Sequence, residues 1–261
     1  MLAQLSDPHL GAQWGGCDPV AALAAAVESV HALRPAPDAV LVTGDLTENA
    51  ADAEYALARE LLASLDAPLH VLPGNHDDAP GLRRHFDMPG VDGEPVHYAA
   101  DLGPLRLVVI DSTRPGENPG VLDEARLSRL DDELAAAPGV PTVIAMHHPP
   151  LVTGIPPLDE IGLPADDRRA LGAVVERHAQ VRRIVAGHMH RAIAGDLAGR
   201  LVVAAPSTYM QARLDLSSAQ LELEPDPIGF AVHVLREGEV ISHIQTVKRP
   251  APTRGPAEPH G

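Results

Sequence analysis

The stretch Leu69-His70-Val71-Leu72-Pro73-Gly74-Asn75-His76-Asp77 combines a short apolar segment with a turn that carries three different polar side chains. A run of Leu and Val that ends at a Pro-Gly pair predicts a buried strand followed by a tight turn. Open α/β sheets bind their ligands at the carboxyl ends of their strands. The amide, imidazole and carboxylate after this strand are therefore candidates for a functional site.

Similar strands alternate with helices through most of the chain. We predict strands at residues 2–6, 39–43, 69–73, 105–111, 142–147 and 181–186. Asp18 and Pro19, a cap and first-turn pair, predict a helix to about Leu33. Apolar residues at three- and four-residue spacings predict helices at 50–65 and 123–136, and a fourth is predicted at 166–178. This alternation is typical of an α/β domain, so we expect a largely parallel first sheet.

After Met189 the pattern changes to strands alone. They are predicted at residues 192–197, 200–205, 228–235 and 239–247, with turn residues between them. We expect these strands to form a meander that packs on the first sheet as a second one. Four prolines among the twelve residues from Pro250 onward predict disorder. The chain is thus expected to form one domain over residues 1–248, followed by a disordered tail over 249–261.

Five strand ends carry polar strings of the same character. They are Asp7-Pro8-His9, Gly44-Asp45, Gly74-Asn75-His76-Asp77, His147-His148-Pro149-Pro150 and Gly187-His188-Met189-His190. Alternate residues of an extended chain point the same way, so the pairs Asp7/His9 and His188/His190 are each expected to converge on one point. Any one string alone is more often an ordinary turn with a hydrogen-bonded histidine. Five of them in order at strand ends indicate a site.

Together these strings resemble the motif blocks of the calcineurin-like metallophosphoesterases. The blocks are Asp-x-His, Gly-Asp, Gly-Asn-His-Asp/Glu, a lone His and Gly-His-x-His, and all occur here in order from Asp7 to His190. The last two strings are most similar to the branch that holds class III cyclic-nucleotide phosphodiesterases and glycerophosphodiesterases. The resemblance implies an α/β fold of two packed mixed β-sheets flanked by helices.

The resemblance also implies a dinuclear metal centre. One metal would take Asp7, His9 and His190, the other Asn75, His147 and His188, and Asp45 would bridge both. Carboxylate, imidazole and amide donors without a thiolate suit Mn, Fe, Zn or Co. With two divalent metals, two carboxylates and a bridging hydroxide, the local charge is about +1, which suits a singly charged phosphodiester.

The implied reaction is in-line attack of a metal-bridging hydroxide on phosphorus. By the same resemblance, Asn75 and His76 contact the substrate, His76 contacts the phosphate or protonates the leaving oxygen, and Asp77 orients His76. The residues also allow His76 a purely structural role and Asp77 the role of a turn or cap carboxylate. His148 is open to a structural or a functional role, and Arg191 could reach a phosphate or lie exposed.

The net charge and the cysteine content of the chain limit its possible binding partners and its cellular compartment. The chain carries 20 Lys and Arg against 36 Asp and Glu, a net charge of −16, which opposes binding to duplex nucleic acid or a membrane surface. The single cysteine, Cys17, cannot pair within the chain, and no basic segment precedes an apolar run at the N-terminus. We therefore expect a cytoplasmic protein with a small phosphodiester as its partner. Residues 206–230 lie where relatives carry a cap or dimerising element, which leaves a homo-oligomer open.

The sequence thus predicts an enzyme, a metal-dependent phosphoric diester hydrolase acting on cyclic nucleotides or glycerophosphodiesters. The alternatives are a broad phosphomonoesterase, a nuclease, and a catalytically inactive metal-binding scaffold. The segment after Asp45 departs from the Asp-Arg-Gly continuation of Ser/Thr protein phosphatases. The absence of a basic stretch disfavours the nuclease, and the presence of every ligand in the motif blocks disfavours the scaffold.

Overall fold

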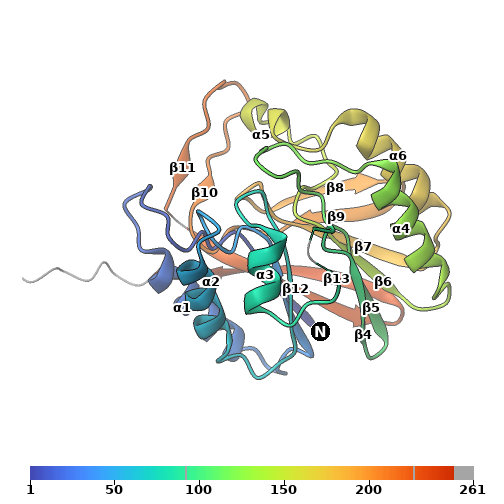
Figure 1. Ribbon diagram of the computed structural model, residues 1–261, viewed down its shortest axis with the longest axis horizontal. Helices are drawn as coiled ribbons and strands as arrows, with labels where there is room; N and C mark the ends of the chain where they lie inside the picture. Colours follow the sequence, from blue (N-terminus) through green and yellow to red (C-terminus); the bar gives the residue numbers. More distant parts are fainter. Residues whose placement is uncertain (92, 226, 250–261) are drawn as a thin grey trace, which may run out of the picture.

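Two mixed β-sheets pack face to face, and helices cover the outer face of each (Figure 1). The computed structural model describes residues 1–91, 93–225 and 227–249. The tail predicted to be disordered lies, apart from Arg249, outside the described residues. The predicted fold of two packed mixed sheets flanked by helices is confirmed.

The first sheet has the strand order β13-β12-β1-β2-β3. Its strands are β1 (Leu2–Leu5), β2 (Ala39–Thr43), β3 (Leu69–Leu72), β12 (Ile228–Arg236) and β13 (Glu239–Val247). The three N-terminal strands run parallel, and the β12–β13 hairpin adds antiparallel to β1. Its outer face is covered by α1 (Pro19–His31), α2 (Asp52–Leu62) and α3 (Ala79–His85).

The second sheet has the order β4-β5-β6-β7-β9-β8. Its strands are β4 (Tyr98–Leu102), β5 (Leu105–Val109), β6 (Thr142–Ala145), β7 (Val181–Ala186), β8 (Ile193–Leu197) and β9 (Arg200–Ala204). Strands β5, β6, β7 and β9 are parallel, while β4 and β8 are antiparallel edges. The covering helices are α4 (Glu124–Ala135) and α6 (Ala165–Glu176).

The predicted division into a parallel first sheet and a separate C-terminal meander is wrong. The N-terminal strands split between the two sheets, and each C-terminal hairpin extends a different one. The β8–β9 hairpin pairs with β7, which precedes it directly, whereas β12 returns to β1 at the other end of the chain. Which open edge a hairpin joins depends on pairing between distant residues, and hydrophobic periodicity carries no information about it.

The uninterrupted apolar runs of the strands follow from burial of both their faces. Successive side chains of a strand point to opposite faces. Leu2 and Leu41 accordingly pack between the sheets, whereas Ala3 and Val42 pack under the helices. This double burial holds the strand ends rigidly, so that the loops after them have fixed starting points.

Five short elements are not predicted from the sequence: α3, β4, α5 (Pro156–Glu160), β10 (Gln211–Ala212) and β11 (Leu223–Glu224). The two short strands β10 and β11 form an arm beside α5, at the upper left of Figure 1. Segments this short show too few periods for their type to be read from sequence. Within the described residues, no helix is long and apolar enough to cross a membrane.

Candidate metal centre

The loops after β1, β2, β3, β6 and β7 meet at one edge of the sandwich. They approach one another closely: a Cβ on Gly187 would lie 2.1 Å from Ser6 Oγ, and one on Gly74 2.1 Å from Asp45 Oδ1. Because both distances are far below van der Waals contact, only glycine fits at these two positions. This explains why glycine precedes these motif residues.

Five of the seven candidate ligand residues have a left-handed rather than an extended backbone. The φ angle is 51° at Asp7, 47° at His9, 50° at Asp45, 68° at His188 and 47° at His190. Non-glycine residues in this region cost about 1–3 kcal/mol each and cluster at functional sites. The prediction that an extended backbone makes His188 and His190 converge on one point is therefore wrong, because they belong to two different groups of donors.

The first donor group is fully buried and consists of Asp7, His9, Asp45 and His190. One donor atom of each lies within 4.8 Å of the others. His9 Nε2 lies 2.9 Å from His190 Nε2 and 3.5 Å from Asp45 Oδ2.

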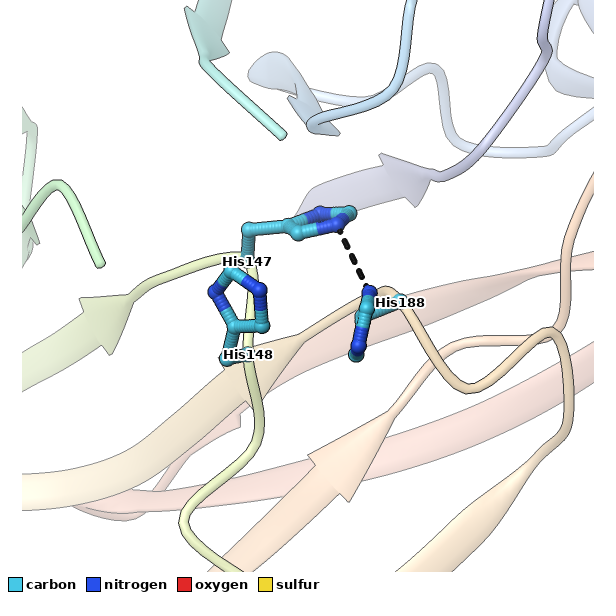
Figure 2. Close-up of side chains that lie close together, drawn as sticks. All are labelled: His147, His148 and His188. Carbon is cyan, nitrogen blue, oxygen red and sulfur yellow. Dashed lines mark hydrogen bonds between the residues drawn. The ribbon is translucent and has the colours of Figure 1, made fainter. Parts of the chain in front are cut away.

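The second donor group consists of Asn75, His147 and His188 and lies on the other side of Asp45. Figure 2 shows His147 and His188 pointing toward each other, with His188 Nδ1 3.2 Å from His147 Nε2, and His148 beside them. His147 Nε2 is also 3.1 Å from Asn75 Oδ1 and 3.4 Å from Asp45 Oδ2. The same oxygen of Asp45 thus stands between the two donor groups.

Outward hydrogen bonds set the tautomer of each inward-facing imidazole. His147 Nδ1 donates to the Thr43 carbonyl (2.8 Å), His188 Nε2 to that of Ile161 (3.0 Å) and His190 Nδ1 to that of Met210 (3.0 Å). His9 Nδ1 pairs with Glu48 Oε2 at 2.8 Å. Partners of this kind on the far nitrogen are a regular feature of metal-ligating histidines.

This arrangement fits metal ions. With their protons held on the outer side, two neutral imidazoles would direct lone pairs at each other across 2.9 Å in one group and 3.2 Å in the other. That contact is repulsive unless a positive charge lies between the nitrogens, either a proton, as the raised pKa of His147 allows, or a metal ion. Nitrogen and carboxylate donors without sulfur suit Mn, Fe, Zn or Co.

The electrostatics of the pocket also favour positive charge. Burial disfavours an ionised Asp45, but His147 and His9 outweigh it and hold the pKa of Asp45 well below its usual range. Burial likewise disfavours a charged His147, but Asp45 and Asp7 raise its pKa to about 9. Burial, with His9, lowers the pKa of His190 to about 3, which leaves this imidazole neutral and able to bind a metal.

A chain of buried hydrogen bonds reaches Asp7 from His233 on β12, the strand beside β1. His233 Nε2 lies 2.9 Å from Gln4 Oε1, Gln4 Nε2 donates to Thr43 Oγ1 (2.9 Å), and Thr43 donates to Ser6 Oγ (2.7 Å). Ser6 then donates to Asp7 Oδ2 at 2.6 Å. With all donors oriented toward the carboxylate, the bonds polarise one another and fix the Asp7 rotamer.

The residues predicted for substrate and proton transfer lie at the rim of the centre. The side chain of His76 is 34% exposed, and its Nδ1 donates to the Glu48 carbonyl at 3.0 Å. Asp77 accepts from the backbone N–H groups of Leu46 and Gly74 at 3.1 and 3.0 Å. Among the described residues, no hydrogen bond joins Asp77 to the His76 ring, so the contacts seen for Asp77 hold the loops together.

The roles of His148 and Arg191, which the sequence left open, follow from their hydrogen bonds in the structure. Both ring nitrogens of buried His148 are engaged, Nδ1 by Ser112 Oγ at 2.9 Å and Nε2 by the Asn118 carbonyl at 3.0 Å. No lone pair is left for a metal, so His148 positions the loop that carries Asn118. Arg191 donates to the Ala212 carbonyl at 2.9 Å and thereby ties the β10–β11 arm to the centre.

Sequence reasoning missed Glu48 and Trp14. One oxygen of Glu48 bonds the His9 ring, and the other accepts the Trp14 indole N–H at 2.9 Å. Neither residue belongs to a motif block. The position of Glu48 three residues after Asp45 is the only signal that could have drawn attention to it.

A family model described as calcineurin-like phosphoesterase matches residues 1–192. The chain belongs to this family. The resemblance predicted from the motif blocks is confirmed, and with it the enzyme class, a phosphoester hydrolase.

Curated relatives and a solved structure of similar fold cover most of the chain. The probable glycerophosphodiester phosphodiesterase GpdQ of Arcobacter nitrofigilis is 32% identical, over 91% of this chain and 89% of its own length. The 3',5'-cyclic adenosine monophosphate phosphodiesterase CpdA of Pseudomonas aeruginosa is 32% identical over 81% and 77%. A dimetal phosphatase from Danio rerio has a TM-score of 0.69 at 16% identity, covering 95% of this chain and 98% of its own.

Removal of the Glu48 carboxylate should weaken metal binding at the first donor group. In Glu48→Ala, the His9 ring loses its outer acceptor, and outer partners of this kind are typically worth about 10–100-fold in metal affinity. Competition with a chelator measures this change. Glu54→Gln is the control, because the Glu54 carboxylate contacts the same loop at Asn49. This variant should retain the metal affinity of the wild type. Equal affinity in Glu48→Ala and wild type would contradict the role assigned to Glu48.

Proposed function

We propose that this member of the family is a dinuclear metal-dependent phosphodiesterase that hydrolyses small phosphodiesters, namely cyclic nucleotides or glycerophosphodiesters. The observation that carries the proposal is the position of Asp45 Oδ2, 3.5 Å from the inward nitrogen of His9 and 3.4 Å from that of His147. One carboxylate oxygen can therefore serve both donor groups. The relatives described above, one named as a glycerophosphodiester phosphodiesterase and one as a cyclic adenosine monophosphate phosphodiesterase, support this choice of substrates.

The proposed ligands are those implied by the motifs. Asp7, His9 and His190 would hold one metal, Asn75, His147 and His188 the other, and Asp45 both. Two bound cations of Mn, Fe, Zn or Co would neutralise charge on the phosphate and lower the pKa of a bound water. The protein supplies imidazoles and fixed carboxylates at these positions.

His76 is proposed to donate a proton to the leaving oxygen. Its side chain lines the cavity beside the donor groups, and its Nδ1 is bonded to the Glu48 carbonyl. In the described part of the chain, no hydrogen bond engages Nε2, which leaves this nitrogen for the substrate. Asn75 lines the same cavity and would contact a phosphate oxygen. Asp77 would act through the loop that carries both residues.

The enzyme should prefer diesters to monoesters. The cavity is lined by metal-ligand candidates, His76, Asn118 and apolar side chains, and none of its described lining residues is Lys or Arg. A monoester dianion gains more than a diester monoanion from extra cationic donors. We expect kcat/KM for bis(4-nitrophenyl) phosphate to exceed that for 4-nitrophenyl phosphate, and little action on duplex DNA.

A variant can test the physical reason for this preference. Asn118→Arg places a cation at the cavity wall and should shift the ratio of the two kcat/KM values toward the monoester. A wild-type monoester preference of about tenfold or more, or about 1.4 kcal/mol in the transition state, would instead favour a phosphomonoesterase.

We further propose that the enzyme works in the cytoplasm. The single cysteine, Cys17, is free, which suits a reducing compartment. Cell fractionation with an antibody to the chain tests this assignment.

A further inference from the structure

The cavity beside the metal centre has one polar side and one apolar side. It has a volume of about 150 Å³ and opens to solvent. Its polar side consists of the metal-ligand candidates with His76 and Asn118. Its apolar side is formed by Trp14, Leu158, Ile161, Ala212, Leu221 and Leu223.

The apolar wall comes from segments far apart in sequence. Trp14 lies in the loop after β1, Leu158 and Ile161 lie in and just after α5, and the remaining three belong to the β10–β11 arm and its connection. Leu221 remains 41% exposed, although it is a large apolar side chain at the edge of this cavity. An apolar wall offers no partners to the hydroxyls of a glycerol group, and burying such groups unpaired is costly. A flat uncharged ring can lay its face on such a wall and keep its polar edge toward solvent.

Trp14 is held in place before any ligand binds. Its indole N–H donates to Glu48 Oε1, and its ring packs edge-on against His9 at 5.4 Å and Tyr209 at 4.7 Å between ring centroids. The Tyr209 hydroxyl donates to the Trp14 carbonyl. A ring fixed in this way loses little conformational entropy when a second ring stacks on it.

We propose that Trp14, Leu221 and Leu223 form a subsite for a flat, uncharged ring carried by the alcohol of the phosphodiester. The site therefore selects nucleoside-type esters over glycerol esters. This inference rests on the proposed function, because it concerns the substrate of the same centre.

The chain contains a single tryptophan, so its fluorescence reports on this subsite alone. Adenosine, which has the ring and lacks the phosphate, should quench the fluorescence of the holoenzyme in a saturable manner, whereas glycerol should not. Leu221→Ala should weaken the adenosine response. Leu214 is an exposed leucine of the same arm that does not line the cavity. Leu214→Ala should therefore leave the adenosine response unchanged.

Kinetics provide a second test with its own control. Trp14→Phe and Trp14→Leu both lose the hydrogen bond to Glu48, but only Trp14→Leu loses the ring. Stacking on an aromatic side chain is worth about 1–3 kcal/mol per base. Relative to Trp14→Phe, Trp14→Leu should therefore lower kcat/KM for cyclic adenosine monophosphate by about tenfold or more, with a much smaller change for glycerophosphoethanolamine.

Absence of quenching by adenosine, equal quenching by glycerol, or equal losses on both substrates in Trp14→Leu would each overturn the subsite. Failure of the proposed function has a different outcome. An enzyme that hydrolyses neither diester would contradict the phosphodiesterase assignment, while the fluorescence titration would still decide whether the ring binds.

Discussion

Asp45→Ala should remove metal from both sites, reducing the content from about two ions per chain to almost none. The same carboxylate oxygen faces the inward nitrogens of His9 and His147, so each site loses a ligand and a negative charge. Metal ions supply several kcal/mol of transition-state stabilisation. At about 1.4 kcal/mol per factor of ten, kcat/KM should fall by about 10³-fold or more. Elemental analysis and diester kinetics measure the two effects.

The controls separate loss of a ligand from loss of the fold. Asp45 also accepts the His76 backbone N–H at 2.9 Å, so the alanine variant leaves that group unpaired. Asp45→Asn preserves the shape of the side chain and should still lose metal. Circular dichroism can confirm that the variant is folded. Asn75→Ala should chiefly empty the second site. Full metal content in a folded Asp45→Ala protein would refute the bridging assignment.

His76→Ala should slow the hydrolysis of a cyclic nucleotide or a glycerophosphodiester by about 10²–10⁴-fold, the usual contribution of a general acid. An alkoxide leaving group needs a proton, whereas a nitrophenolate leaves readily without one. Hydrolysis of bis(4-nitrophenyl) phosphate should therefore be much less affected. Steady-state rates on the two substrate types, at matched metal loading, provide the comparison.

Metal content is the control for His76→Ala, because His76 lies 4.8 Å from His9 between ring centroids. Both ions should remain bound. Equal losses on the aryl diester and the alkyl diester would mean that His76 binds phosphate without donating a proton. The ligand assignments would stand in that case.

The motif residues could be predicted because each lies in a string that has a physical meaning on its own. A buried strand, a glycine where backbones approach closely, and a polar side chain directly afterwards place Asp45, Asn75 and His188 at one edge of the sheets. The strand and helix ranges followed from local periodicity in the same way. The left-handed backbone at Asp7, His9, Asp45, His188 and His190 was not predicted.

The amino-acid sequence by itself determined the αβ alternation, the strand ends that carry the donors and the family. Only the tertiary structure decided which sheet each hairpin extends, and how Glu48, Trp14 and the chain of hydrogen bonds from His233 support the centre. His233 bonds Gln4 across 229 positions and Trp14 bonds Glu48 across 34. Local patterns carry the propensity of a segment for helix or strand. Partners this far apart in sequence meet only through the packing of the whole chain.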